Sequence, residues 1–253
     1  RPLESMRLPV ERVDITIPPP PSKLSVAKAT PEALAKGQAA LLKAAGLTGG
    51  SAAWTAIKSI ATESSETLHM AGQSMSMTGT TQWRLPDRIL AIRKLPMGEI
   101  KQGCDGTTGW MAAMGQLQEQ PKAVASLKEE YERSFIRLFG EPGTYRVQML
   151  AEPKVVEGVS YAVAVVTSQT IKDWMLYFAP DGQLARMEYV GEGMGGAPAH
   201  MVEIYGDWKS VGAVKWPHST RTLADDKPVI ESTVTSVTLN PTLADELFKK
   251  PTQ

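Results

Sequence analysis

Hydrophobic and polar residues alternate along most of the chain after about residue 57. The clearest example is the segment SMSMTGTTQWRLP, residues 74–86. One of its faces carries Met75, Met77, Thr81, Trp83 and Leu85. The other face carries Ser74, Ser76, Thr78, Thr80, Gln82 and Arg84. A period of two with one apolar side is typical of an antiparallel strand that buries one face, so this segment is predicted to be such a strand.

The same alternation predicts a series of further strands, separated by turn signals such as Pro96-Met97-Gly98, Asp181-Gly182 and Asp225-Asp226. The expected strands cover residues 88–95, 99–104, 108–113, 144–151, 160–168, 171–179, 184–191, 199–209, 216–223 and 229–239. Roughly ten strands joined by short loops make one meandering antiparallel sheet, and a sheet of this length must curl or split to bury its apolar face.

Helical periodicity is confined to a few segments, of which two precede the strands. Thr30 is a suitable N-cap and Pro31 a suitable first residue for a helix that ends at Gly46. A short second helix is expected to have Ser51 as its N-cap and to carry Ala53, Trp54 and Ile57.

A third helix is expected to interrupt the strands between Pro121 and Gly140. Its apolar residues recur at steps of three and four: Val124, Leu127, Tyr131, Phe135 and Leu138. A last helical turn is expected from Leu243 to Phe248. The predicted fold class is therefore α+β. Because so few helices must cover a long sheet, the concave side of the sheet is expected to keep a cavity lined by apolar side chains.

The first 30 residues differ from the rest of the chain. They contain the run Pro18-Pro19-Pro20-Pro21, which is expected to adopt an extended polyproline II conformation and to act as a stiff spacer. The chain is therefore predicted to divide into a Pro-rich arm, residues 1–30, and one domain, residues 31–253. The chain does not begin with Met and carries no signal peptide, so it is expected to be a processed product or a piece of a longer chain.

Composition excludes several classes of function. The 27 Lys and Arg balance the 27 Asp and Glu, so no net charge attracts nucleic acid or an anionic membrane surface. No apolar run approaches the roughly 18 residues that a membrane-spanning helix needs. Hydrophobic residues make up 42% of the chain and charged residues 21%, which is typical of a globular protein rather than a disordered one.

The single cysteine lies in the segment KQGCDGTTGW, residues 101–110. One cysteine forms no internal disulfide and no multi-cysteine metal site. Asp105-Gly106 is a favoured dipeptide for a hairpin turn, and strand-like residues flank it. Cys104 has no His or second Cys nearby in the sequence to lower its pKa. The segment is therefore predicted to be a structural hairpin with a buried thiol rather than a reactive site.

The segment GEGMGGAP contains the pattern GxGxxG at Gly191, Gly193 and Gly196. A dinucleotide site requires this pattern to open a helix, but the residues that follow alternate like a strand. That strand is expected to place Val202, Ile204 and Trp208 on one side and Glu203, Tyr205 and Asp207 on the other. The pattern is therefore interpreted as a hairpin loop, and no nucleotide cofactor is expected.

Local motifs for catalysis are absent from the sequence. The three histidines, His69, His200 and His218, are scattered, and none belongs to H-E-x-x-H or H-x-x-E-H. No serine lies in G-x-S-x-G. The chain itself is therefore not expected to be an enzyme, and no metal site or cofactor is predicted, although a site assembled from distant residues stays open.

Methionine is abundant, with 11 of the 12 residues after position 69. Flexible, polarizable Met side chains suit surfaces that accept varied apolar ligands, but they also fill ordinary cores. The same two interpretations apply to the six tryptophans, Trp54, Trp83, Trp110, Trp174, Trp208 and Trp216.

Strand parity nominates the residues of the expected apolar cavity. On the clearest strand these are Met75, Met77, Trp83 and Leu85. On the inserted helix, expected to cover the cavity, they are Leu127, Tyr131 and Phe135. A register error of one residue would reverse the strand's two faces.

Four stretches carry a pattern of turns and core residues: 83–87, 100–110, 205–217 and 234–251. The pattern resembles the outer-membrane lipoprotein-sorting (LolA/LppX-like) superfamily over about residues 32–251. This resemblance implies an unclosed antiparallel half-barrel whose concave face is covered by helices and encloses a cavity. It also implies a non-catalytic, periplasmic or otherwise exported protein, whose partners are lipids, fatty acids or the acyl chains of lipoproteins.

A second resemblance lies in VERVDITIPPPPSKL, residues 10–24. This segment is similar to the tail of an insulinase-like zinc peptidase (pitrilysin family), and some bacterial members carry such a sheet domain at the C-terminus. The resemblance implies that the catalytic H-x-x-E-H lies upstream of these residues. Two hypotheses therefore stay open: a lipid- or lipoprotein-binding domain, and an accessory domain joined to an N-terminal peptidase.

Overall fold

The computed structural model describes residues 29–70, 72–193 and 196–252. The predicted Pro-rich spacer and the segment that resembles a peptidase tail lie outside the described residues.

Fourteen strands of the described residues form one antiparallel sheet. Its N-terminal half consists of β1 (Ser59–Met70), β2 (Gln73–Arg84), β3 (Arg88–Leu95), β4 (Gly98–Asp105), β5 (Gly109–Ala113) and β6 (Gln116–Glu119). Its C-terminal half consists of β7 (Arg146–Met149), β8 (Lys154–Val156), β9 (Val159–Thr167), β10 (Trp174–Phe178), β11 (Leu184–Glu192), β12 (Pro198–Val211), β13 (Val214–Ala224) and β14 (Lys227–Leu239).

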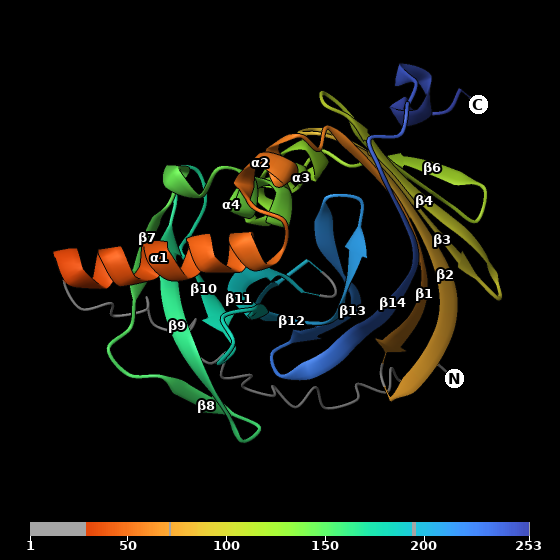
Figure 1. The fold of residues 1–253 in the computed structure, drawn as a ribbon. Helices are drawn as coiled ribbons and strands as arrows, with labels where there is room; N and C mark the ends of the chain where they lie inside the picture. The colour runs from red at the N-terminus through yellow and green to blue at the C-terminus, as the bar shows by residue number, and fades with distance from the viewer. Residues whose placement is uncertain (1–28, 71, 194–195, 253) are drawn as a thin grey trace, which may run out of the picture.

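The strand order is a meander with one long-range junction. The order runs β6-β5-β4-β3-β2-β1-β14-β13-β12-β11-β10-β9-β7, and β8 pairs with β9. The junction pairs β1 with β14, for example Ile60 with Leu239. The two ends of the path, β6 and β7, do not pair with each other, so the sheet is a large unclosed half-barrel (Figure 1).

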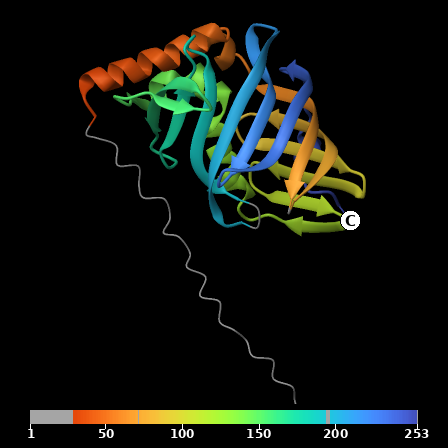
Figure 2. The ribbon, with the colours of Figure 1, turned by 90° about the horizontal axis from the view of Figure 1, so that it is seen from below.

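Helices cover the concave face of this half-barrel. They are α1 (Pro31–Leu47), α2 (Ser51–Thr55), α3 (Ala123–Arg133) and α4 (Phe135–Gly140), with the 3-10 turns η1 (Pro142–Thr144) and η2 (Asp245–Phe248). Figure 1 shows α1 crossing the C-terminal half of the sheet, with α2, α3 and α4 gathered near one end of the arc. Figure 2, the view from below, shows α1 lying along that same half. The predicted fold class, α+β with a curved antiparallel sheet and few helices, is confirmed.

The largest core fills the space between α1, α2, α4 and the C-terminal half of the sheet. The fully buried side chains at its centre include Leu41, Trp54, Leu138, Phe139, Trp174, Leu176 and Leu184. Helix α1 approaches β7 so closely at Gly37 that a Cβ atom there would collide with the carbonyl group of Val147. This glycine therefore allows the helix to pack directly on the strand.

The predicted third helix is in fact two helices. Ser134 adopts an extended conformation (φ −63°, ψ 149°) and separates α3 from α4. Its hydroxyl donates to the Tyr131 carbonyl at 2.7 Å and accepts from the Arg137 amide at 3.3 Å. Serine is a strong N-cap residue, so it ends one helix and begins the next within a continuous apolar pattern.

The first two helices follow the prediction only in part. Thr30 is the N-cap of α1, and its hydroxyl accepts from the Ala33 amide at 3.1 Å, as predicted. The prediction of Ser51 as a cap is wrong, because Gly50 occupies that position with φ 85° and Ser51 is the first helical residue. Ile57 lies beyond the end of α2, in the buried core.

Three strands were not assigned individually from the sequence. The edge strand β6 and the strand β8 have four and three residues, too short to show a period. Strand β1 is long, but its sequence SIATESSETLHM carries polar residues on both faces. The inward-facing polar residues of β1 belong to the charged group described below.

The predicted faces of the strand at residues 199–209 are wrong in part. Asp207 has a positive φ of 52° and interrupts the alternation of β12. Tyr205 and Trp208 consequently both contact the ring of Phe135, with centroid distances of 4.8 and 5.3 Å. Before this irregularity, Glu203 lies on the same side as Tyr205, which donates a hydrogen bond to it at 2.6 Å.

The segment around Cys104 is a hairpin turn between β4 and β5, as predicted. Gly106 has φ 94°, and the Asp105 carboxylate accepts hydrogen bonds from the amides of Thr107 (2.9 Å) and Thr108 (2.7 Å). The Cys104 side chain is buried, and burial raises the pKa of its thiol. A protonated, inaccessible thiol is a weak nucleophile, so this segment is structural.

Candidate functional site

Helix α3 lies over the concave face of the N-terminal half and packs there on a small apolar cluster. Trp83 of β2, Cys104 of β4 and Leu127 of α3 are its buried members. Tyr131, one turn after Leu127, meets Trp83 edge-on with a centroid distance of 6.1 Å. We call this group the α3 cluster. Leu127 is the only buried residue of α3, so this contact is the main attachment of the helix.

A much larger aromatic group lies beside it, beneath α4. Phe135 contacts Trp54 (6.3 Å), Phe139 (5.7 Å) and Trp216 (6.3 Å), in addition to Tyr205 and Trp208. Trp54 also meets Phe139 at 5.5 Å and donates from its indole nitrogen to the Thr48 hydroxyl at 3.1 Å. This aromatic core joins α2, α4, β12 and β13.

A small pocket lies at the seam between the helices and the end of β2. Its volume is about 170 Å³. Apolar groups of Ile57, Leu85, Pro86, Tyr131 and Ile136 line it, together with Thr55, Lys58 and Glu141. We call it the seam pocket. Leu85 packs against both the α3 cluster and the aromatic core, so the pocket is placed between them.

The seven residues that the sequence nominates for the cavity lie in different parts of the structure. Trp83, Leu127, Leu85 and Tyr131 meet in the α3 cluster and at the seam pocket. Phe135 belongs to the aromatic core. Met77 is buried further along β2, and Met75 is half-buried beyond it. The seven residues therefore do not surround one empty cavity, and Met77 also borders the polar groove described below.

Charged and hydroxyl groups occupy the concave face beyond the α3 cluster. Glu66 of β1 is 7% exposed; it accepts from the Ser64 hydroxyl at 2.7 Å and lies 2.8 Å from the Arg93 guanidinium. On the opposite wall, Glu203 accepts from the hydroxyls of Tyr189 and Tyr205, each at 2.6 Å. Burial and the Glu203 carboxylate raise the pKa of both tyrosines, so both remain donors.

Helix α3 contributes two further charges to this group. The Arg133 guanidinium stacks 4.2 Å from the centroid of the Tyr189 ring. Glu130 is solvent-accessible, yet the protein that surrounds it displaces much of the bulk water. This desolvation, followed by repulsion from Glu203, raises the pKa of Glu130 to about 7. Arg133 and Arg93 oppose the shift.

Sequence parity did not identify this charged group. Glu66 and Ser64 alternate with other polar residues, so β1 shows no apolar face. Glu203 was placed on the side of its strand opposite Val202 and Ile204, with no role assigned to it. The sequence does show Tyr205 two residues after Glu203, which places both on one face of the strand. The second tyrosine, Tyr189, comes from β11, and only the register of β11 and β12 brings it close.

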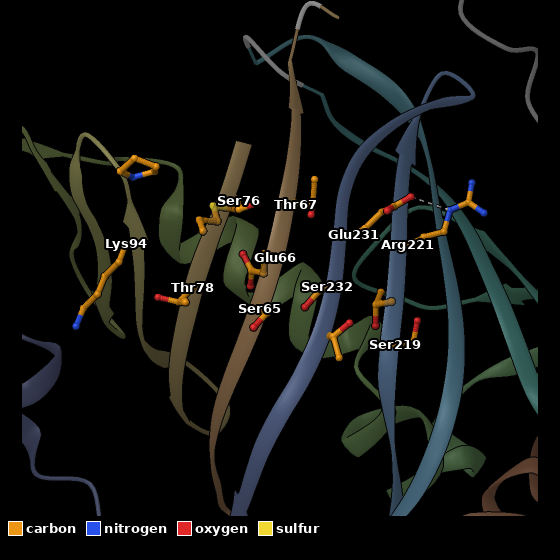
Figure 3. Close-up of a pocket in the computed structure, with 14 residues that line it drawn as sticks. Ser65, Glu66, Thr67, Ser76, Thr78, Lys94, Ser219, Arg221, Glu231 and Ser232 are labelled. Carbon is orange, nitrogen blue, oxygen red and sulfur yellow. Dashed lines mark ion pairs between the residues drawn. The ribbon is translucent and has the colours of Figure 1, made fainter. Parts of the chain in front are cut away.

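A polar groove lies on the outer face of the sheet, opposite the helices (Figure 3). Its volume is about 660 Å³. Two rows of cross-strand neighbours line it: Lys94, Thr78, Ser65, Thr233 and Ser219, and beside them Ser76, Thr67, Glu231 and Arg221. The intervening residues Glu66, Met77, Thr220 and Ser232 and the turn residue Pro96 also border it. In Figure 3 the strands β2, β1, β14 and β13 lie side by side with helices behind them. Hydroxyl groups dominate the lining, so this groove differs from the apolar cavity that the sequence predicts.

The histidines lie near carboxylates but form no metal centre. His200 lies 3.4 Å from Glu188, and His69 lies 3.0 Å from the Ser74 hydroxyl and 3.9 Å from Glu231. Among the described residues, no group of three or more His, Cys, Asp or Glu side chains is arranged to hold a metal ion. Within the same residues, no helix has the length and apolar character required to cross a membrane.

Comparisons with known proteins identify the fold. No protein-family model and no curated protein matches the chain. Among solved structures, the chain is similar to a LolA superfamily protein from Nitrosomonas europaea, with 13% identity, a TM-score of 0.52 and coverage of 85% of this chain and 97% of that one. It is equally similar to a putative outer membrane lipoprotein-sorting protein domain from Vibrio parahaemolyticus, with 13% identity, a TM-score of 0.52 and coverage of 86% and 97%.

A third similar structure is a DUF1329 family protein from Desulfovibrio piger, with 9% identity, a TM-score of 0.53 and coverage of 86% of this chain and 97% of that one. These structural neighbours share the half-barrel fold with this chain over almost their whole length. At such low identity the likeness describes the fold and not the ligand.

Proposed function

We propose that the chain is a non-catalytic, exported protein that binds an apolar chain between α3 and the sheet. The ligand is a lipid, a fatty acid or the acyl chain of a lipoprotein. The observation that carries this proposal is the seam pocket, which opens between the α3 cluster and the aromatic core. The shared half-barrel fold and the resemblance to lipoprotein-sorting proteins support the same ligand class.

The volume of the seam pocket implies that binding moves α3. At about 170 Å³ it is smaller than the roughly 300–1,000 Å³ typical of ligand pockets. An apolar chain therefore enters only if Leu127 and Tyr131 withdraw from Trp83. Helix α3 suits such a movement because it buries one residue and has no side-chain N-cap, and because Ser134 interrupts its continuity with α4.

Burial of an acyl chain supplies enough free energy for useful affinity. A chain of about fifteen methylenes contributes roughly 12 kcal/mol when buried at ~0.8 kcal/mol each, before the cost of ordering is subtracted. The proposed contact residues are Met75, Met77, Trp83, Leu85, Leu127, Tyr131 and Phe135.

The first experiment is native mass spectrometry and solvent extraction of the purified chain, followed by uptake of a fluorescent fatty acid. A bound lipid or saturable uptake is expected. Replacing Trp83 by Ala is expected to weaken uptake, whereas replacing exposed Leu42 on α1 by Ser is expected to leave uptake unchanged. A ligand-free protein that takes up no fatty acid would rule out the proposal.

The movement of α3 has its own test, which uses the native cysteine. Val124 and Leu127 pack in the α3 cluster with Cys104, so the variants V124C and L127C are compared for disulfide formation with it. In the variant that forms the bond, oxidation is expected to block uptake and reduction to restore it. Equal uptake in both redox states would show that α3 does not need to open.

No feature of the described residues favours the peptidase-associated alternative. The resemblance behind it is confined to residues 10–24, outside the described part of the chain. The structures compared above include no peptidase.

A further inference from the structure

The exposed methionines of the sheet gather at the tips of its hairpins. Met70 is 49% exposed, Met97 64% and Met114 82%. Met70 is the last residue of β1, Met97 lies in the turn from β3 to β4, and Met114 lies in the turn from β5 to β6. Each precedes a glycine by one or two residues, at Gly72, Gly98 and Gly115.

The topology places these three tips at one rim of the half-barrel. In an antiparallel meander, alternate turns lie at the same end of the strands. The turns after β1, β3 and β5 are alternate turns of the path β6-β5-β4-β3-β2-β1, so all three face the same way. In Figure 1 these hairpins end along the lower and right-hand edge of the molecule. We call this edge the methionine rim.

Turn geometry does not account for a methionine at the most exposed tip. Met114 and Gly115 form a two-residue turn between paired residues Ala113 and Gln116, with φ 51° and 76°. Asn or Gly is favoured at the first of these positions, and a long side chain there is conformationally unfavourable. The buried core does not account for it either, since 82% of the residue is exposed.

The groups around Met97 and Met114 are neutral or weakly cationic. The turn residues beside the three methionines are Gly72, Gln73, Pro96, Gly98, Gly115 and Gln116. The nearest carboxylate after Met97 is Glu99, which Lys101 neutralises at 3.0 Å. Lys94 is exposed, and no ion pair is found for it among the described residues. Two exposed carboxylates, Asp225 and Asp226 in the β13–β14 turn, lie at the same edge beside Met70, so the part of the rim free of such charges is that around Met97 and Met114.

We propose that the methionine rim inserts into the interface of a lipid bilayer. Neighbouring tips are two strands apart, at about 10 Å, so the apolar groups are separate points rather than one continuous patch. A deformable lipid surface accepts separate flexible points, whereas a protein partner is better matched by a continuous packed patch. Insertion stops at the headgroup boundary because the turn amides retain their need for water.

The test is co-sedimentation of the whole chain with vesicles. Two vesicle types are used: phosphatidylcholine alone, and equal parts of phosphatidylcholine and phosphatidylglycerol. The double variant M97S/M114N is expected to lower the partition coefficient by about tenfold or more. Asn is compatible with the positive φ of position 114, so the hairpin should be retained; circular dichroism checks the fold.

Val155→Ser is the matched control, because Val155 is 69% exposed on β8 in the other half of the sheet. This control is expected to bind vesicles like the unmodified chain. The proposal is overturned if the unmodified chain binds neither vesicle type, which would leave a protein partner for the rim, or if the double variant binds as well as the control. A dimer in light scattering that the double variant abolishes would instead assign the rim to a second copy and would also overturn it.

Vesicle binding by the methionine rim does not require fatty-acid binding on the concave face. The double variant is expected to take up fatty acid normally, and a disulfide-locked α3 is expected to leave vesicle binding unchanged. Failure of one proposal is therefore distinguishable from failure of the other.

Discussion

The aromatic core beneath α4 and the concave face beneath α3 belong to one sheet but are built differently. Phe135 alone meets five aromatic rings, whereas α3 is held mainly by Leu127. Beyond the α3 cluster the second region continues into charged and hydroxyl groups, among them Glu66, Arg93 and Glu203. The difference separates a densely packed frame from a cover that is attached by few buried side chains.

The comparison is tested most directly by truncating a buried side chain in each region. Phe139→Ala is expected to lower the free energy of unfolding by about 3–5 kcal/mol, because its fully buried ring leaves a cavity that the frame cannot close. Leu127→Ala is expected to cost about 2 kcal/mol, since α3 can settle onto the sheet. Denaturant unfolding measures both values. Equal losses would mean that α3 is as rigidly packed as α4.

The charged part of the second region is tested at Arg93. Arg93→Leu leaves the buried Glu66 carboxylate without its cation, so a loss of about 2 kcal/mol is expected. The matched control is Lys101→Leu, which removes an exposed pair with Glu99 and is expected to cost less than about 0.5 kcal/mol. Adding Glu66→Gln to Arg93→Leu is expected to recover part of the loss; no recovery would mean that the pair is not the cause.

The boundary between the regions is tested at Ser134. Ser134→Ala removes the cap of α4, and a loss of about 1 kcal/mol is expected. The variant should also slow the opening of α3, because an uncapped junction favours one continuous helix. Hydrogen exchange of the α3 amides measures this effect. Faster exchange in the variant would contradict it.

The smallest expected effect is a pH dependence of the free energy of unfolding, caused by Glu130. The pKa of Glu130 is raised to about 7 in the folded chain, above the ordinary value of 4.5, so the folded state binds the proton more tightly. Stability is therefore expected to fall as the pH rises from 4.5 to about 7 and to level off above that. Because the side chain is solvent-accessible, the change should be less than about 1 kcal/mol.

Glu130→Gln is expected to remove this pH dependence and to leave the chain slightly more stable at pH 8 than the unmodified protein. Glu129→Gln, one position along α3, is the matched control. Thermal unfolding between pH 4.5 and pH 8 measures both variants. An unchanged slope in Glu130→Gln would assign the pH dependence to other groups.

The sequence was sufficient to predict the frame because its signals are local. Alternation placed most of the long strands within a few residues of their observed bounds, such as Arg88–Leu95, and Thr30 marked the beginning of α1. Local patterns failed where a single residue redirects the chain. Ser134 divided a continuous apolar helix, and the positive φ of Asp207 changed the faces of β12.

The charged concave surface could not be predicted because it is assembled across the sheet. Glu66 and Arg93 come from strands that are not neighbours, and Glu203 lies on the far side of the hollow. Strand parity assigns a polar residue to the solvent side by default, and only the tertiary arrangement shows that these residues face inward.

The pairing of β1 with β14 also has a consequence for how the chain folds. This junction lies in the middle of the sheet, yet it joins residues as distant in sequence as Ile60 and Leu239. Until β14 is complete, the N-terminal meander has an unpaired edge at β1, and no local contact can replace the missing strand. A topology with such long-range contacts folds slowly, on the scale of milliseconds to seconds or longer. The half-built sheet is exposed to edge-to-edge association during that interval, so aggregation competes with folding until β14 pairs with β1.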